Sequence, residues 1–179
     1  MKHLLVSIFT ITVLIGCDNE KENKETAVET KIESSNQPVP AVPAPAVSDL
    51  PSFQVVNAAN QFQNLADLKG KKLFVNLWAT WCGPCRVEIP SIRQLAAKTD
   101  PAKTAFIMLS LDDDFETAKA FANKTKMGLP VYYPAGNLPA LFNVQSIPST
   151  FIFNEKGELI HQQTGAINYD TKEFEEMLK

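Results

Sequence analysis

Two cysteines separated by two residues, directly after an apolar segment, constrain the fold of this chain more than any other feature. Residues 73–78 predict a buried strand, and a helix is predicted to begin at Cys82 and to continue to about residue 99. Residues three apart on the first turn of a helix are neighbours, with Cβ atoms about 5–6 Å apart, which is near the separation that a disulfide requires. Cys82 and Cys85 can therefore form and break a disulfide without rearranging the fold.

The two cysteines are predicted to have different roles. Cys82 lies where the unpaired N–H groups and the positive end of the helix dipole stabilise a thiolate, so it is the predicted nucleophile. Cys85 lies one turn deeper and is the predicted resolving thiol. Between them, Gly83 lets another backbone approach closely, and Pro84 fits the first helical turn because it needs no N–H there.

Paired cysteines of this spacing also occur in zinc sites, which need further ligands. The only other cysteine is Cys17, and the only histidines are His3 and His161. Cys17 and His3 belong to the N-terminal segment at residues 1–17, which is interpreted below as a signal peptide. The strand–helix–strand context therefore favours a redox dithiol over a metal site, and neither a metal nor an organic cofactor is predicted.

Three further motifs make the chain resemble the TlpA/ResA type of thioredoxin-fold protein, the tethered extracytoplasmic thiol-disulfide oxidoreductases. They are Leu-Trp-Ala-Thr-Trp at 77–81, Glu-Ile-Pro at 88–90, and Ser-Ile-Pro-Ser-Thr at 146–150. The resemblance covers residues 51–179 and implies an α/β thioredoxin-like fold, in which a central mixed sheet is flanked by helices. It also implies an N-terminal β-strand extension and a helix–strand insertion before the strand that follows the cis-proline.

Apolar patterns and turn residues predict the remaining elements. A continuous apolar run at 105–109 indicates a strand buried on both faces, joined to 73–78 by a right-handed crossover. The other predicted elements are a strand pair within 53–62, a helix capped within 112–114, a strand at 131–133, a helical turn within 138–144, a hairpin of 151–153 with 159–163 that turns at Gly157, and a last helix capped by Asp170 with Glu173 in capping-box position.

The resemblance implies that the Ile147–Pro148 bond is cis and lies beside the disulfide. Most X-Pro bonds are trans, so without the resemblance Pro148 would be expected to be trans and to begin a strand. In the resembling family the backbone of the residue corresponding to Ile147 docks an extended substrate, and the proline keeps metals away from the sulfurs. Gly83, Pro84 and Trp81 are predicted to belong to the same docking surface.

Asn76 marks a departure from cytosolic thioredoxins, which carry a buried aspartate six residues before the nucleophile. Asparagine cannot accept the proton, so another group must assist the deprotonation of Cys85. Glu88 could be an ordinary solvated helix residue, but the resemblance favours it as that base, provided that partial burial raises its pKa. Trp78 is predicted to pack in the core, and His161 is predicted to be an ordinary surface residue of an edge strand.

Residues 1–17 resemble a lipoprotein signal peptide. The apolar stretch 4–15 follows Lys2 and is too short to span a bilayer, and the sequence Leu-Ile-Gly-Cys that ends at Cys17 resembles a lipobox. Lipidation at Cys17 is predicted, with a plain cleaved signal peptide as the alternative. Residues 18–50 are rich in charges and then in proline, which predicts a disordered tether before the domain at 51–179.

The resemblance implies a lipid-anchored enzyme of the bacterial cell envelope that faces the periplasm and reduces disulfides of exported proteins, for example apocytochrome c. Its electrons would come from a membrane dithiol donor. The alternatives are a dithiol oxidase or isomerase and a redox-inactive or copper-binding module. Copper carriers of this fold generally separate their cysteines by three residues and add a histidine. The net charge of -3 and the absence of a basic stripe argue against nucleic acid.

Overall fold

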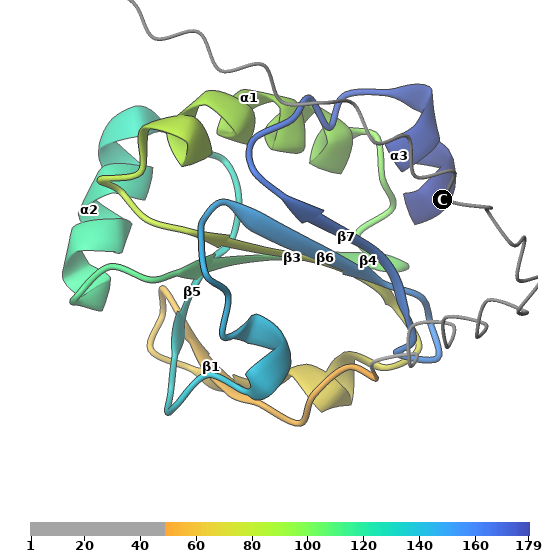
Figure 1. The fold of residues 1–179 in the computed structure, drawn as a ribbon, viewed down its shortest axis with the longest axis horizontal. Helices are drawn as coiled ribbons and strands as arrows, with labels where there is room; N and C mark the ends of the chain where they lie inside the picture. The colour runs from red at the N-terminus through yellow and green to blue at the C-terminus, as the bar shows by residue number, and fades with distance from the viewer. Residues whose placement is uncertain (1–48) are drawn as a thin grey trace, which may run out of the picture. The chain divides into compact units, whose positions relative to one another are not determined.

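The computed structural model describes residues 49–179, whose strands form one mixed sheet of seven in the order β2-β1-β5-β4-β3-β6-β7 (Figure 1). In chain order the elements are β1 (Gln54–Asn57), β2 (Phe62–Asn64), the 3-10 helix η1 (Leu65–Leu68), β3 (Lys72–Trp78), α1 (Gly83–Ala97), β4 (Thr104–Ser110), α2 (Phe115–Thr125), β5 (Val131–Pro134), the 3-10 helix η2 (Ala140–Phe142), β6 (Ser149–Phe153), β7 (Leu159–Thr164) and α3 (Lys172–Leu178). The predicted α/β architecture is confirmed, including the β1–β2 extension and the α2–β5 insertion before β6.

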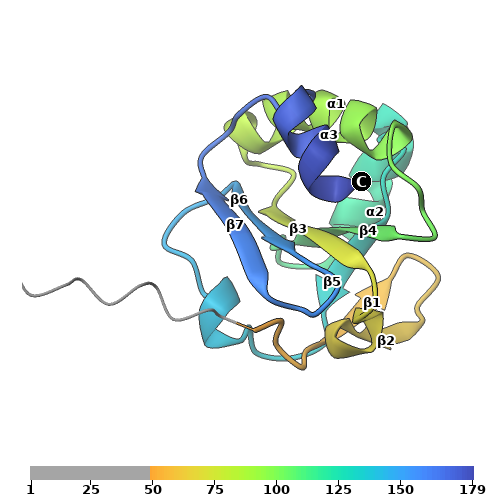
Figure 2. The same cartoon turned by 90° about the vertical axis from the view of Figure 1, so that its right-hand side faces the viewer.

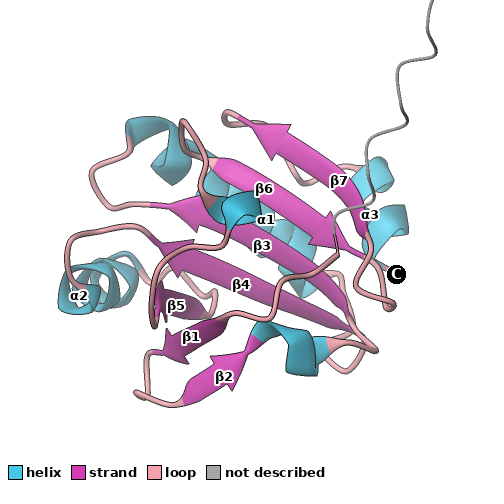
Figure 3. Ribbon diagram, turned by 60° about the horizontal axis from the view of Figure 1, so that its bottom comes forward, coloured by secondary structure: helices cyan, strands magenta, loops and turns pink. Residues whose placement is uncertain are grey.

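The centre of the sheet is the parallel pair β3 and β4, visible in Figure 3 between β6 and β5. β5 continues the sheet in parallel beyond β4, whereas β6 pairs antiparallel with β3 and then forms a hairpin with β7. Both central strands are apolar along most of their length because they are covered on both faces. The apolar runs in the sequence therefore identified the two innermost strands correctly.

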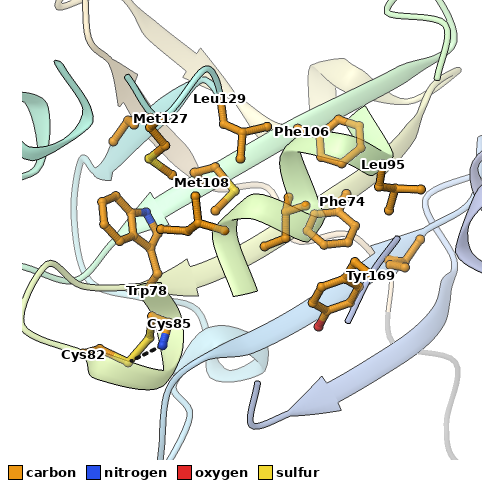
Figure 4. Close-up of a cluster of buried hydrophobic side chains, with 14 of the residues drawn as sticks. Phe74, Trp78, Cys82, Cys85, Leu95, Phe106, Met108, Met127, Leu129 and Tyr169 are labelled. Atoms are coloured by element: carbon orange, nitrogen blue, oxygen red, sulfur yellow. Dashed lines mark hydrogen bonds between the residues drawn. A yellow bond between two sulfur atoms is a disulfide. The ribbon is translucent and has the colours of Figure 1, made fainter. Parts of the chain in front are cut away.

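Alternating residues of β3 point into two separate cores, one on each face of the sheet. On one face, Phe74 and Trp78 pack against α1, α2 and α3, as the close-up in Figure 4 shows in part. Figure 2 shows α1 and α3 lying over this face. On the other face, Leu73, Val75 and Leu77 pack against Phe142 of η2 and the segment around η1.

Local caps follow the sequence at α2 but not at α3. Asp114 is the N-cap of α2, where its carboxylate accepts a hydrogen bond from the Thr117 N–H at 2.8 Å, as predicted. The prediction that Asp170 caps α3 is wrong, because Thr171 occupies the N-cap position and makes no side-chain capping bond. The Asp170 carboxylate instead accepts a hydrogen bond from Lys98 at the end of α1, 2.5 Å away. A tertiary ion pair has replaced the local cap.

The turn between β6 and β7 depends on Gly157, as predicted. Its φ of +85° lies in the left-handed region, where a side chain would be strained. A Cβ at this position would also lie 3.0 Å from the Lys69 side chain.

Residues 1–48, which include Cys17 and most of the tether predicted at 18–50, lie outside the described residues. Leu50, predicted to end the tether, is instead buried in the core, and its N–H donates a hydrogen bond to the Gly157 carbonyl at 2.7 Å. Within residues 49–179, no helix is both long enough and apolar enough to cross a bilayer.

Candidate active site

A disulfide between Cys82 and Cys85 lies at the start of α1, beyond the carboxyl end of β3 (Figure 4). Cys82 is the N-cap of the helix, and its sulfur accepts a hydrogen bond from the Cys85 N–H at 3.2 Å. Cys82 is 5% exposed, whereas Cys85 is completely buried. An attacking group from outside can therefore approach the Cys82 sulfur more readily than the Cys85 sulfur.

The second part of the site comes from the segment before β6. The Ile147–Pro148 peptide bond is cis, as the resemblance predicts. The Ile147 carbonyl oxygen lies 3.8 Å from the Cys82 sulfur, although the two residues are 65 positions apart. The Pro148 carbonyl accepts a hydrogen bond from the Gly165 N–H at 2.8 Å, which ties this segment to the end of β7. The backbone of Ile147 thus lies directly beside the disulfide.

Glu88 lies one turn beyond Cys85 and is only 2% exposed. One carboxyl oxygen accepts a hydrogen bond from the Asn76 side-chain amide at 2.8 Å, and the other is 3.4 Å from the Ile167 N–H. Burial raises the pKa of Glu88 to about 7, and the two hydrogen bonds offset only part of that effect. The condition stated above for Glu88 to act as a base, a pKa raised by burial, is therefore met.

Asn76 links Glu88 to a residue that the sequence analysis did not identify. Its amide nitrogen also donates to the Thr150 hydroxyl at 2.9 Å, so its two hydrogens reach Glu88 and Thr150. β3 and β6 pair so that Asn76 is directly opposite Thr150, and all three side chains are buried. The only sequence indication of this link was the polar Asn76 in an otherwise apolar strand.

Asp112 holds the loop that leads from β3 to the disulfide. Its buried carboxylate accepts a hydrogen bond from the Thr80 hydroxyl at 2.6 Å, from the Thr80 N–H at 3.0 Å and from the Ser110 hydroxyl at 2.8 Å. From the sequence, Asp112 is predicted only to contribute to capping α2. Its position directly after a buried parallel strand could have indicated this role, because the carboxyl ends of such strands meet at one edge of the sheet.

The two tryptophans are placed as expected. Trp78 is fully buried with its ring centroid 5.6 Å from that of Phe121, whereas Trp81 is 69% exposed. Gly83 and Pro84 are also exposed, and the exposed Val87 adds an apolar side chain that the sequence analysis missed. An exposed apolar surface thus adjoins the buried sulfurs.

His161 is not the ordinary surface residue that was predicted. It lies on the edge strand β7, but its ring is half-buried and packs edge-on against Phe174 of α3, with 5.3 Å between the centroids. The prediction failed because the alternation along β7 turns His161 toward α3. Within residues 49–179, no three side chains of the metal-binding types converge on a common point.

Comparisons with known proteins agree with this geometry. The Redoxin family matches residues 42–178. The thioredoxin-like protein YneN of Bacillus subtilis is 32% identical over 130 residues, which cover 72% of this chain and 75% of that protein. The thiol-disulfide oxidoreductase ResA of Bacillus thuringiensis is 30% identical over 118 residues, which cover 65% of this chain and 68% of ResA.

Solved structures show the same fold. The crystal structure of a putative thiol:disulfide interchange protein DsbE from Chlorobium tepidum superposes with a TM-score of 0.64 at 26% identity. That match covers 73% of this chain and 93% of the other. StoA from Bacillus subtilis superposes with a TM-score of 0.59 at 22% identity, covering 76% of this chain and 98% of StoA.

The raised pKa of Glu88 predicts how stability depends on pH. A carboxyl whose pKa is higher in the folded state binds more protons there, so its contribution to stability is lost as the pH rises from the unfolded value of 4.5 toward 7. For the oxidised wild-type chain, we expect Glu88 to lower the free energy of unfolding by about 2–3 kcal/mol between pH 5 and pH 8. Urea denaturation at both pH values measures this change.

Glu88→Gln should remove that part of the pH dependence, whereas the exposed Glu176→Gln should retain it. Identical pH dependence in the wild type and in Glu88→Gln would show that Glu88 has an ordinary pKa.

Proposed function

Since this chain belongs to the Redoxin family and is a thiol-disulfide oxidoreductase with the Cys82–Cys85 pair, we propose that it reduces disulfides of exported proteins. One observation carries the proposal: a slightly exposed Cys82 sulfur at a helix N-terminus lies above a fully buried Cys85. The first can attack a partner, and the second can react only with what is bound to the first.

In the first step, the Cys82 thiolate of the reduced enzyme attacks one sulfur of the partner disulfide. A mixed disulfide forms between Cys82 and the partner, and the other partner sulfur leaves as a thiolate. The Cys85 N–H lies 3.2 Å from the Cys82 sulfur, and the helix dipole acts in the same direction. Both favour the thiolate over the neutral thiol.

In the second step, Cys85 attacks the Cys82 sulfur and releases the remaining partner thiolate. The enzyme is then oxidised, and the partner has gained two electrons; its two thiolates take up protons from the solvent. Cys85 is fully buried, so the acceptor of its proton must also lie inside the protein. Glu88, one helical turn away and with a pKa of about 7, is suited to take this proton near neutral pH.

We assign the docking of the partner to the surface around Cys82. The Ile147 backbone, 3.8 Å from the sulfur, can pair with an extended partner strand. Trp81, Gly83 and Pro84 are exposed next to it. Pro148 has no N–H, and we propose that it keeps metals away from the sulfurs.

The reducing direction is supported by the Gly-Pro dipeptide between the cysteines. The same dipeptide occurs in thioredoxin, which has a reduction potential of about −270 mV. A reductant outside the cytoplasm needs electrons, and we propose a membrane dithiol protein as the donor. Apocytochrome c is the proposed example of a substrate, and a midpoint potential above about −180 mV would instead indicate an oxidase or isomerase.

We also propose that residues 1–17 are a lipoprotein signal peptide, that Cys17 carries the lipid, and that residues 18–48 tether the domain on the periplasmic side. The support is the lipobox-like sequence before Cys17 and the charged, proline-rich composition that follows it.

Cys85→Ser is expected to stop the reaction after its first step, because serine cannot attack the mixed disulfide. The full-length wild-type chain should reduce insulin in the presence of dithiothreitol, measured as turbidity. Cys85→Ser should be inactive in this assay but accumulate Cys82-linked partners on non-reducing gels, and Cys82→Ser should do neither. A wild-type chain that leaves insulin intact would contradict the proposed function.

Glu88→Gln is expected to slow the second step by roughly a hundredfold at pH 7, a typical contribution of a general base. In the wild type the rate of resolution should rise with pH through about 7 as Glu88 loses its proton. The variant should lack this rise. The measurement is single-turnover release of thionitrobenzoate from a preformed mixed disulfide with Cys82, with Glu176→Gln as the control. An unchanged pH profile in Glu88→Gln would exclude Glu88 as the base.

Cys17→Ala is expected to move the protein from the membrane fraction to the soluble fraction, because the substitution removes the site of lipidation. Fractionation of the producing bacterium with a high-salt wash, followed by immunoblotting, measures this distribution. A Cys17→Ala protein that stays with the washed membranes contradicts the proposed anchor.

A further inference from the structure

An apolar groove of about 370 Å³ lies between α1 and α2, outside the site described above. Its apolar lining includes Ile89 and Pro90 from α1, Phe121 from α2, and Met127 just beyond α2. Arg86 and Arg93 of α1 also line it. Both arginines are exposed, so the groove combines an apolar floor with a cationic rim.

The groove continues the same side of α1 on which Cys82 lies. Residues three or four apart share a helix face, and Cys82, Arg86, Ile89 and Arg93 follow one another at intervals of four, three and four. From Cys82 to Ile89 the helix rises by about 10 Å. A partner whose disulfide meets Cys82 can therefore reach the groove with a short extended segment.

The charges around the groove are not neutralised by neighbouring side chains. Within residues 49–179, Arg86 and Arg93 form no ion pair, and neither do Lys124 and Lys126 at the end of α2. Arg93 donates one long hydrogen bond, of 3.5 Å, to the carbonyl oxygen of Lys126, the C-cap residue of α2. The acidic residue of α2, Glu116, is paired with Lys119.

This local excess of positive charge occurs in a chain whose net charge is -3. Arg86 lies in the first turn of α1 and Arg93 lies beyond its midpoint, so neither is in the last turn, where a cation would stabilise the helix dipole. No ion pair within residues 49–179 accounts for the two guanidinium groups.

We propose that this groove binds a segment of the protein substrate in which an apolar side chain is flanked by carboxylates. The apolar side chain would fill the floor formed by Ile89, Phe121 and Met127, and the carboxylates would pair with Arg86 and Arg93. Electrostatic complementarity of this kind mainly raises the rate of productive encounter and selects among partners. The inference rests on the proposed function, and it names the class of substrate that the dithiol reduces fastest.

The test uses three peptides that differ only in the segment meant for the groove. Each carries one cysteine as a mixed disulfide with thionitrobenzoate and, after a spacer of one residue, the sequence Glu-Leu-Glu, Gln-Leu-Gln or Lys-Leu-Lys, so that the leucine is three positions from the cysteine. Three extended residues span about 10 Å, the rise from Cys82 to Ile89. The reduced full-length chain carries Cys17→Ala so that only the dithiol reacts, and stopped-flow absorbance gives second-order rate constants.

We expect the Glu-Leu-Glu peptide to react roughly three- to tenfold faster than Gln-Leu-Gln at low salt, and Lys-Leu-Lys to react more slowly than both. The ratio between the acidic and neutral peptides should shrink at 300 mM salt, because exposed charges are then screened. In Arg86→Gln/Arg93→Gln the ratio should fall to about one, and Arg93→Glu should favour the lysine peptide. The control Lys103→Gln, a distant exposed cation, should keep the wild-type ratio.

Equal rates for the three peptides on the wild type would overturn the proposal, and so would a preference that survives in the double variant. A concentration-dependent dimer that Arg93→Glu abolishes would also overturn it, because the groove would then be an interface between two copies. Failure of the proposed function is recognised separately, since the neutral peptide would then release no thionitrobenzoate and insulin would not be reduced.

Discussion

The packing of α1 across β3 is the constraint on which the site depends. Ile92 and Leu95 of the helix are fully buried against the face of the sheet that carries Phe74 and Trp78, so the helix cannot slide without opening the core. Only three residues separate the end of β3 from Cys82. The first turn of α1 must therefore lie at the carboxyl edge of the sheet, where Asp112 holds the connecting loop through Thr80.

Polar side chains buried beneath the disulfide supply a group that can transfer protons. A carboxyl group is costly to bury, and the hydrogen bonds from Asn76 and the Ile167 N–H offset only part of that cost, which leaves the Glu88 pKa near 7. A group with such a pKa can accept or release a proton near neutral pH, whereas an exposed glutamate cannot. Burying Glu88 lowers the stability of the fold, but it places a group that titrates near neutral pH one helical turn from Cys85. Such a loss of stability in exchange for a titratable group is typical of functional sites.

The sequence predicts best those elements that are marked by a strong local pattern, such as an apolar run or a capping residue. The apolar runs at β3 and β4 are typical of the inner strands of a parallel sheet, and Asp114 of the predicted capping segment 112–114 caps α2. The predictions for Asp170 and His161 failed because both side chains found partners that are distant in the chain, namely Lys98 and Phe174. Local propensity cannot anticipate a partner brought near by the fold.

The sequence by itself determined the dithiol, its strand–helix setting and the different roles expected of its cysteines, because these follow from spacings of a few residues. The resemblance in motifs predicted the cis bond before Pro148 and the role of Glu88 as the base for Cys85. Only the tertiary structure decided that Asn76 joins Glu88 to Thr150, that Asp112 anchors Thr80, and that Arg86 and Arg93 flank an apolar groove. These contacts depend on strand register and helix packing, which place residues far apart in the chain within hydrogen-bonding distance.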